Sequence, residues 1–323
     1  MIICLGEALI DMVRREIPGG GEAFLPLPGG SPYNTAVAIG RLGVPVKFLG
    51  RCSRDFFGEL LIRRLRENGV GDDLIVRTDQ NSTLAFVKLE AGKEPRYAFY
   101  TEGTADRSFC AADLEAKLPG GQLPPDTRCL LFGSIAMTME PVASTIESLV
   151  LSQGRGGPVI SFDPNIRPFM IRDREAYVRR CETWLSAVTI AKVSEADLAF
   201  MYPALGREEA LARVLSRGPV LAVSTLGPEG ATALLRRGDE TLRASAPVVD
   251  LPVVDTIGAG DTFHGALLAW LELRGMMSRP AIGALDGEEL REALWFANRA
   301  ASLVCGRQGA EPPTRAELEA LRG

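Results

Sequence analysis

Short apolar segments typical of strands alternate with amphipathic or apolar helix-like segments along most of this chain, and this alternation most limits its possible folds. The predicted strands are Ile2–Leu9, Val46–Gly50, Val159–Phe162, Ala187–Ala191 and Val220–Ser224. The predicted helices are Asn34–Leu42, Phe56–Glu67, Asp261–Leu273 and Glu288–Cys305. Such an order favours an α/β fold, in which a largely parallel sheet is covered by helices on both faces.

One region departs from this alternation. Thr83–Glu90 and Pro95–Thr101 are joined by four residues and predict a hairpin with no helix between its strands. Together with the stretch after Asp11 it could form a small separate β-sheet, although a plain surface hairpin is the simpler alternative. The Pro/Gly-rich pieces at 17–32 and 119–125 are typical of loops. We therefore expect one domain over residues 1–323, with a small sheet formed by segments near 12–28 and 83–103.

Composition excludes several functional classes. The net charge is −5 and no basic run occurs, so neither nucleic acid nor an anionic membrane is an expected partner. Six scattered cysteines without a C-x-x-C pair argue against zinc and against a disulfide framework, and they suit a reducing cytoplasm, where we expect the protein to be located. No apolar run approaches the roughly 18 residues that a membrane helix needs.

The segment Asp255–Asp261 carries the strongest chemical signal. Gly258 and Gly260 would lie at the N-terminus of the helix that follows, where unpaired N–H groups and the helix dipole favour an anion. With Ala259 they would present backbone N–H groups to a phosphoryl group. Asp261 would repel a bound phosphate, so its position makes sense if it accepts a proton from an attacking hydroxyl. A helix capped by Asp, with glycines in the preceding turn, is the simpler alternative.

These residues also carry a family resemblance. The sequence Asp-Thr-Ile-Gly-Ala-Gly-Asp at 255–261 resembles the C-terminal signature of the ribokinase-like (PfkB) carbohydrate kinases, and Pro28–Ala38 resembles the family's N-terminal Gly-Gly-x-x-x-Asn segment. The two motifs lie near the family's usual ends of the chain. The resemblance implies a three-layer α/β sandwich with a β-sheet lid over the substrate, which often also forms a homodimer contact. It further implies ATP and Mg²⁺ as cofactors, a small-molecule sugar as substrate, and Asp261 as the base.

The resemblance also implies a sugar site. The predicted sugar-binding residues are Asp11, Gly29, Gly30, Asn34, Phe99 and Arg167. Asp11, taken as the end of the first strand, could accept two hydrogen bonds from a diol, and Asn34 offers both a donor and an acceptor. Each has a simpler alternative, because Asn34 could cap a helix, Asp11 could be a surface acid, and Arg167 could be a turn residue.

The nucleotide and metal sites rest on weaker matches. The family's Asn-x-x-Glu motif, which organises hydrated Mg²⁺, aligns with Ser194 and Asp197, and both positions depart from it. Because of these departures, Asp197 is predicted to act on Mg²⁺ through water. The alternative makes Asp197 an exposed acid in the first turn of a helix. The other predicted nucleotide contacts are Lys192, Thr225, Gly227, Gly230 and Asn298, with Lys192 otherwise a solvated lysine.

Two further features of the sequence are a possible potassium site and a single histidine. Gly306–Ala310 resembles the segment that forms a potassium site in several relatives, which implies Asp255, Ile257 and Gly309 around K⁺. The single histidine, His264, lies one turn after Asp261 and is expected to pack inside its helix, which makes a Ser-His-Asp hydrolase hard to build. The motifs of P-loop and protein kinases are absent from the sequence.

Within the family, three segments most resemble the bacterial fructokinase branch: Gly6–Met12, Phe99–Arg107 and Asp163–Pro168. The main alternative is a 2-keto-3-deoxygluconate kinase, whose acid substrate usually meets a Tyr-x-Arg pair in the lid. Here the sequences after Tyr97 and Tyr100 supply no arginine, and Glu102 would repel a carboxylate. Ribokinase and nucleoside kinase activities remain open. A catalytically silent sugar-sensing protein on the same fold is the alternative of another class.

Overall fold

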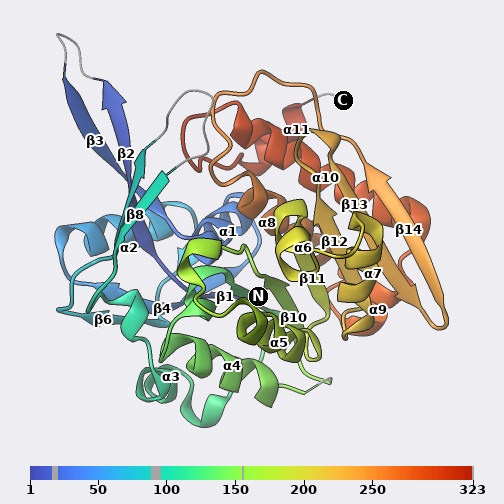
Figure 1. Cartoon of the computed structure of the whole chain (residues 1–323), viewed down its shortest axis with the longest axis horizontal. Coiled ribbons are helices and arrows are strands. Elements are labelled where there is room, and N and C mark those ends of the chain that lie inside the picture. The colour runs from blue at the N-terminus through green and yellow to red at the C-terminus, as the bar shows by residue number, and fades with distance from the viewer. Residues whose placement is uncertain (17–20, 89–95, 155, 322–323) are drawn as a thin grey trace.

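The computed structural model describes residues 1–16, 21–88, 96–154 and 156–321, and its central element is a ten-stranded sheet between two helical layers (Figure 1). The strands are β1 (Ile2–Leu5), β4 (Val46–Ser53), β5 (Val70–Gly71), β6 (Ile75–Thr78), β9 (Cys129–Gly133), β10 (Val159–Asp163), β11 (Ile190–Ser194), β12 (Leu221–Thr225), β13 (Ala231–Arg237) and β14 (Glu240–Ala246). Their order is β14-β13-β12-β11-β10-β9-β1-β4-β5, with β6 also paired to β4. Only β13 and β14 are antiparallel to their neighbours, so the predicted mostly parallel sheet is confirmed.

Helices cover both faces of this sheet. On one face lie α1 (Ser31–Arg41), α2 (Phe56–Glu67), α8 (Ala259–Leu273), α9 (Arg279–Ala284), α10 (Gly287–Cys305) and α11 (Arg315–Ala320). On the other lie α3 (Ala111–Lys117), α4 (Val142–Ser152), α5 (Arg174–Leu185), α6 (Glu195–Met201) and α7 (Arg207–Ser216). Side chains along β1 alternate between two apolar cores, with Ile2 and Cys4 in one and Ile3 and Leu5 in the other. This alternation produces the predicted three layers, because successive residues of a strand point to opposite faces.

A second sheet stands at one end of the molecule, where β2 and β3 project beyond the helical layers (Figure 1). It contains β2 (Leu9–Glu16), β3 (Glu22–Gly29), β7 (Leu84–Lys88) and β8 (Arg96–Tyr100), in the order β3-β2-β7-β8. The antiparallel pairing of β7 with β8 confirms the predicted hairpin, whose connecting residues 89–95 lie outside the described part. Pairing of β2 with both β3 and β7 joins the stretch after Asp11 to that hairpin.

The structure corrects several predicted boundaries. The expected strand Ile2–Leu9 is two strands, β1 and β2, which separate at Gly6, where φ is +149° and an added Cβ would lie 2.6 Å from Pro32 Cγ. Asp11 therefore lies within the small sheet and does not end a strand of the main sheet. The strand predicted from Ala187 begins at Ile190, because Ala187 and Val188 donate backbone hydrogen bonds to the last turn of α5. Helix α1 begins at Ser31, three residues before the predicted start.

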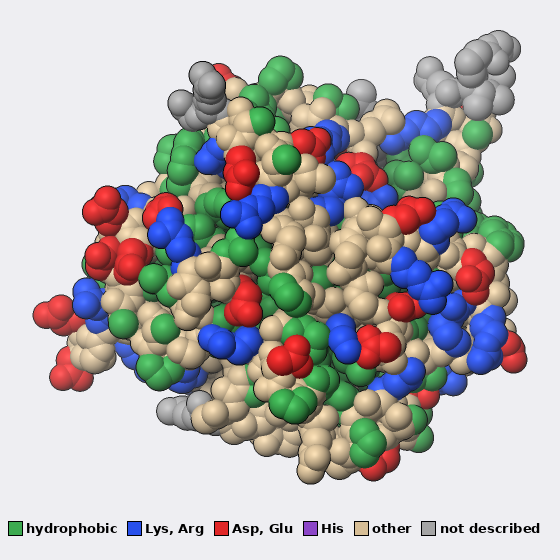
Figure 2. Space-filling model, turned by 180° about the vertical axis from the view of Figure 1, so that it is seen from behind, with side chains coloured by type: hydrophobic (Ala, Val, Ile, Leu, Met, Phe, Trp, Pro, Cys, Tyr) green, Lys and Arg blue, Asp and Glu red, His purple; other side chains and the backbone are tan. Residues whose placement is uncertain are grey.

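The surface and the thiols give further information. Figure 2 shows a face on which acidic and basic side chains are interspersed. All six cysteines are free. In the part of the chain that the structure describes, no helix has both the length and the apolar composition needed to cross a bilayer.

Five short 3₁₀ segments complete the described fold: η1 (Asp106–Ser108), η2 (Pro119–Gly121), η3 (Ser134–Thr138), η4 (Pro168–Met170) and η5 (Gly227–Glu229).

Candidate active site

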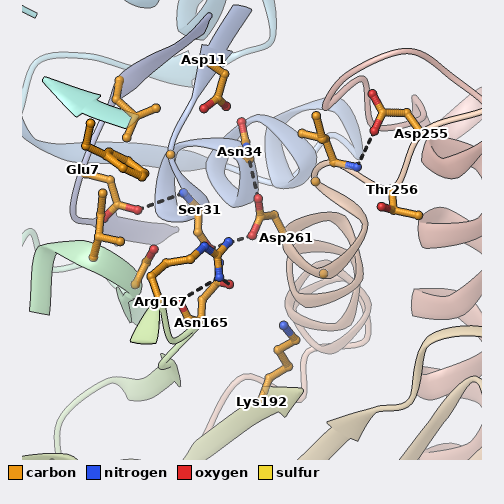
Figure 3. A pocket seen from close by; sticks show the side chains of 18 residues that line it. Glu7, Asp11, Ser31, Asn34, Asn165, Arg167, Lys192, Asp255, Thr256 and Asp261 are labelled. Carbon is orange, nitrogen blue, oxygen red and sulfur yellow. Dashed lines mark hydrogen bonds between the residues drawn. The ribbon is translucent and has the colours of Figure 1, made fainter. Parts of the chain in front are cut away.

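A cavity of about 310 Å³ lies where the small sheet meets the carboxyl ends of the central parallel strands and the N-terminal ends of α1 and α8 (Figure 3). Ligands of open α/β sheets gather at this edge. Its polar lining includes Glu7, Asp11, Ser31, Asn34, Asn165, Arg167, Lys192, Asp255, Thr256 and Asp261. These residues are separated by up to about 250 positions in the sequence, and the fold brings them together.

Asp261 is buried and has two side-chain partners on α1. Ser31 Oγ donates to its Oδ1 at 2.6 Å, and Asn34 Nδ2 donates to its Oδ2 at 2.9 Å (Figure 3). Burial raises the pKa of the Asp261 carboxyl, and Asp163 adds to that rise, while the two hydrogen bonds and Lys192 oppose it. The result is an oriented carboxylate with increased basicity, which is what a general base requires.

The turn before α8 has the backbone of an anion site. Gly258 caps the helix in the left-handed region at φ 76°, and an added Cβ would lie 2.6 Å from Ala310 Cβ, so glycine is required. Among the described residues no backbone carbonyl accepts from Gly260 N–H, whereas Ala259 N–H donates to Thr256 O at 3.2 Å. Gly258 and Gly260 line the 310 Å³ cavity, whereas Ala259 does not. The predicted contribution of Ala259 is therefore weaker than that of the two glycines.

Lys192 is buried rather than solvated, and it rises from β11 into the cavity (Figure 3). Its Nζ lies 2.9 Å from Asp163 Oδ2, and an added Cβ on Gly260 would lie 3.1 Å from the same Nζ. Burial alone would lower the pKa of Lys192, but Asp163 and the other nearby carboxylates hold it above its usual value. The ammonium therefore stays charged next to the anion site.

Asp11, Phe99 and Arg167 also line the cavity. An added Cβ on Gly29 would lie 2.2 Å from Asp11 Oδ2, so the close approach of that carboxylate requires glycine. Burial, followed by the charge of Asp261, raises the pKa of Asp11 to about 7, although Arg167 opposes the shift. Arg167 Nη1 donates to Asn165 Oδ1 at 2.7 Å, which fixes the guanidinium. Five of the six predicted sugar-binding residues thus line one cavity, and the sixth, Gly29, lies against Asp11.

Glu7 is a further cavity residue, and its carboxylate binds two backbone N–H groups. Its two carboxylate oxygens accept from Ser31 N–H at 3.1 Å and from Ala136 N–H at 3.2 Å. An added Cβ on Gly30, where φ is +106°, would lie 2.6 Å from Glu7 O. Burial raises the pKa of Glu7 to about 7. Glu7 therefore ties the start of α1 to the main sheet and positions Ser31.

A second cavity of about 550 Å³ is mainly apolar and shares Thr256 and Gly260 with the first. It is lined by four of the predicted nucleotide contacts, Thr225, Gly227, Gly230 and Asn298, and by Ala259. Asn298 Nδ2 donates to Ala246 O and Pro247 O, which holds the loop before α8 in place. The two cavities therefore meet at the turn that carries the anion site.

Ser194 and Asp197 lie outside both cavities. They form the capping box of α6, in which Ser194 Oγ donates to Asp197 Oδ2 at 2.6 Å and Asp197 N–H donates back to Ser194 Oγ. Asp197 Oδ1 also accepts from Ile166 N–H at 2.7 Å. Asp197 is only 3% exposed, so the alternative that it is an exposed helix-end acid is wrong. Its carboxylate fixes the loop that carries Arg167.

Asp255 joins the two loops predicted to flank potassium. Its Oδ1 accepts from Ile257 N–H and its Oδ2 from Gly309 N–H, both at 3.0 Å. Arg64 Nη2 also donates to Ala310 O at 2.6 Å. Both loops are therefore held next to Gly258.

The family model for pfkB family carbohydrate kinases matches residues 1–317. The chain belongs to the pfkB family of carbohydrate kinases. It is 38% identical over 292 residues to a fructokinase from Rhizobium leguminosarum bv. trifolii, an alignment that covers 90% of this kinase and 86% of its relative.

Solved structures agree with this assignment. The fructokinase from Xylella fastidiosa with bound ATP superimposes with a TM-score of 0.86 at 29% identity, covering 99% of this kinase and 97% of that chain. The fructokinase from Vibrio cholerae O395, solved with fructose, ADP and calcium bound, superimposes with a TM-score of 0.80 at 25% identity, covering 99% and 97%. The predicted ribokinase-like fold and the ATP-dependent sugar kinase class are confirmed.

Several residues of the kinase site were not predicted from the sequence. These are Glu7, Ser31, Asn165 and Thr256 in the first cavity, Asp163 beside Lys192, and the loop 248–253 that lines the second cavity. Ser31 directly follows the glycine pair of the N-terminal motif, and Asp163 and Asn165 lie in the Asp-Pro-Asn-x-Arg-Pro segment, so a local signal existed for these three. The loop 248–253 carries no such signal.

Proposed function

We propose that this kinase transfers the terminal phosphoryl group of ATP to D-fructose, giving fructose 6-phosphate and ADP. The observation that carries the proposal is the position of Asp261. It lies beside Gly258–Gly260, here called the anion turn, where the two cavities meet. A sugar hydroxyl in the first cavity and ATP entering through the second would meet at this point. Fructose is favoured because the curated and structural relatives described above are fructokinases.

Asp261 acts as the base in this proposal. A sugar hydroxyl has too high a pKa to be deprotonated in advance, so the carboxylate orients it and accepts its proton as the oxygen–phosphorus bond forms. Ser31 and Asn34 hold the carboxylate in that orientation. Gly258 and Gly260, with a smaller part for Ala259, direct N–H groups at the transferring group, and Lys192 adds a positive charge.

For the sugar we assign hydrogen-bonding contacts to Asp11, Asn34 and Arg167, an apolar contact to Phe99, and close backbone approach to Gly29 and Gly30. Asp11 and Asn34 suit neutral hydroxyls. A 2-keto acid sugar remains the alternative, because Arg167 places a cation in the cavity. The predicted repulsion by Glu102 does not apply, since Glu102 is exposed and does not line the sugar cavity.

For the nucleotide we assign Thr225, Gly227, Gly230 and Asn298 to the adenosine side of the second cavity. Ser194 lies outside that cavity, so its predicted contact would require a phosphate that extends toward α6. No group of three or more His, Cys, Asp or Glu side chains among the described residues could hold a metal on its own. We therefore propose that Mg²⁺ arrives with ATP, because Mg²⁺ usually keeps several waters and binds through one or two carboxylates and the phosphates.

Asp197 would contact that Mg²⁺ through water, and the ion would neutralise phosphate charge. The carboxylate fits this role because it offers about four acceptor positions, of which three are filled by Ile166 N–H, Ser194 N–H and the Ser194 hydroxyl. We also assign Asp255, Ile257 and Gly309 to a K⁺ site beside the anion turn. Their support is the pair of hydrogen bonds that holds both loops on Asp255.

A homodimer through the small sheet completes the proposal. Phe24 on β3 is 44% exposed, and Tyr100 on β8 is 64% exposed; the strand register places both on the same face of the small sheet as Phe86. The aromatic rings continue across the sheet, since Phe86 lies 5.0 Å from Phe24 and 5.3 Å from Tyr100 between ring centroids. Contiguous exposed apolar side chains of this kind mark interaction surfaces.

An ADP-release assay over a panel of sugars tests the substrate assignment. D-fructose should give the highest kcat/KM, ahead of glucose, ribose, a nucleoside and 2-keto-3-deoxygluconate, with fructose 6-phosphate identified as the product. A tenfold preference for 2-keto-3-deoxygluconate would replace the assignment with the acid-sugar alternative. Tight fructose binding by calorimetry without any turnover would favour the sugar-sensing alternative.

A further inference from the structure

His264 lies on the same face of α8 as Asp261, one helical turn later, and is completely buried. Its Nε2 lies 2.7 Å from Ser161 Oγ, and its Nδ1 lies 3.8 Å from Asp163 Oδ2. Nδ1 has no hydrogen-bond partner among the described residues. A neutral ring that accepts from Ser161 at Nε2 carries its proton on Nδ1, facing Asp163. The expectation that His264 packs within its helix is correct, but its contacts are polar.

Asp163 connects this ring to the anion turn. Its Oδ2 is shared between His264 Nδ1 and Lys192 Nζ, which lies at 2.9 Å, and its Oδ1 accepts from Asn165 N–H at 3.2 Å. Lys192 in turn lies against Gly260. A row of polar side chains therefore runs from Ser161 through His264 and Asp163 to Lys192, in which the 3.8 Å step from His264 Nδ1 to Asp163 Oδ2 is too long for a hydrogen bond.

The position of the Lys192 ammonium matters because other carboxylates are close to it. Asp163, Asp197 and Asp261 all act on its charge. A direct pair between Lys192 and Asp261 would lower the basicity of the base and block its oxygens. The pairing with Asp163 prevents this, and it leaves Asp261 with Ser31 and Asn34 as partners.

Asp163 can perform this task only if it remains charged and oriented when ATP draws the ammonium toward its phosphates. Burial opposes the charged form, but Lys192 and then His264 lower the pKa of Asp163 to about 2. In the tautomer that accepts from Ser161, the Nδ1–H of His264 faces the same carboxylate oxygen and can donate to it as Lys192 turns. Burying these polar side chains beside the apolar core costs desolvation free energy. Apolar residues at the same positions would avoid that cost, so the polar ones point to a function.

We infer that His264 is a positioning residue for phosphoryl transfer, which acts through Asp163 to hold the Lys192 ammonium at the anion turn and away from Asp261. Lys192 contacts the transferring group, whereas His264 and Ser161 contact neither substrate. This inference rests on the proposed function only in requiring phosphoryl transfer to some acceptor, and it does not depend on the acceptor being fructose.

A double-mutant cycle tests the inference with the full-length enzyme, at saturating ATP and with whichever sugar the wild type uses best. His264→Phe removes both ring nitrogens and should lower kcat on the order of 10²-fold, as a misplaced group near the reaction can, with KM for the sugar unchanged. His264→Asn keeps a donor near the Nδ1 position and should retain most of kcat. In a Lys192→Met background, His264→Phe should cause no further loss, because its effect passes through Lys192.

The control is Thr145→Val on α4, which removes a buried hydroxyl that bonds only to Pro141 O and should leave kcat unchanged. Thermal unfolding of every variant separates folding defects from rate effects. If His264→Phe does not fold, Ser161→Ala replaces it and should lower kcat in the wild type but not in Lys192→Met. Equal losses in both backgrounds, or equal rates for the Asn and Phe variants, would overturn the inference. Absence of turnover with every sugar by the wild type would instead remove the proposed function.

Discussion

Asn34 and Asp261 are 227 positions apart, and Asn34 Nδ2 donates a 2.9 Å hydrogen bond to Asp261 Oδ2. This bond joins the first turn of α1, which carries sugar-side residues, to the first turn of α8, which carries the base and the anion turn. Ser31 makes a parallel contact to the other oxygen at 2.6 Å. The two motifs at opposite ends of the sequence are therefore joined in one site.

Asp261→Asn should lower kcat by at least about 10²-fold, because the amide cannot accept the proton of the attacking hydroxyl. Sugar and ATP binding should change little, since the amide has nearly the shape of the carboxylate. Steady-state kinetics with calorimetric binding measurements check this. A variant with more than a tenth of the wild-type turnover would assign the base to another residue.

Asp11 should make the stability of the protein depend on pH. Its pKa is raised to about 7 in the folded state, so the folded protein binds a proton that the unfolded chain has released between about pH 4 and pH 7. The free energy of unfolding should therefore fall as pH rises through this window, by at most about 1.4 kcal/mol per pH unit for this group.

Denaturant unfolding of the wild type and of Asp11→Asn at a series of pH values checks this dependence. The variant should lose less stability than the wild type between pH 4 and pH 7. Glu7, whose pKa is also raised to about 7, contributes with the same sign in both proteins, so the difference isolates Asp11. Parallel curves for the two proteins would show that Asp11 is ionised without penalty.

Asp197→Ala should raise the Mg²⁺ concentration needed for half-maximal rate and lower kcat about 10- to 100-fold, as the loss of an outer-shell metal partner typically does. KM for the sugar should stay close to the wild-type value. The variant also loses the bond to Ile166 N–H, so Asp173→Ala, which removes the N-cap of α5, is the matched control for a lost cap. Identical Mg²⁺ titrations for wild type and Asp197→Ala would leave Asp197 with only its structural contacts, and Glu195 would be tested next.

Phe24→Glu should separate the proposed dimer, because it places a charge within the exposed aromatic surface formed by Phe24, Phe86 and Tyr100. Sedimentation equilibrium should report a dimer for the wild type and a monomer for the variant. Val253→Glu, which charges a more exposed apolar residue of the loop before α8, is the control and should remain dimeric. A wild type that sediments as a monomer would exclude a stable dimer through the small sheet.

The sequence alone was sufficient wherever the determining interactions are local. The ends of α8 and α10 were predicted to within two residues, because glycine turns and continuous apolar faces specify helices over a short span. The position of Gly258, Gly260 and Asp261 at the start of α8 is local for the same reason, and their roles stay predictions. The hairpin β7–β8 was also predicted from adjacent segments.

Only the tertiary structure decided the interactions between distant segments. The break at Gly6, which places Asp11 in the small sheet, depends on its contact with Pro32, and the burial of Lys192 depends on Asp163 from a neighbouring strand. The polar contacts of His264 arise because β10 packs beneath α8. Local propensity contains no information on which charged side chains will share a buried space, and burial together with long-range pairing determines their pKa values and therefore their roles.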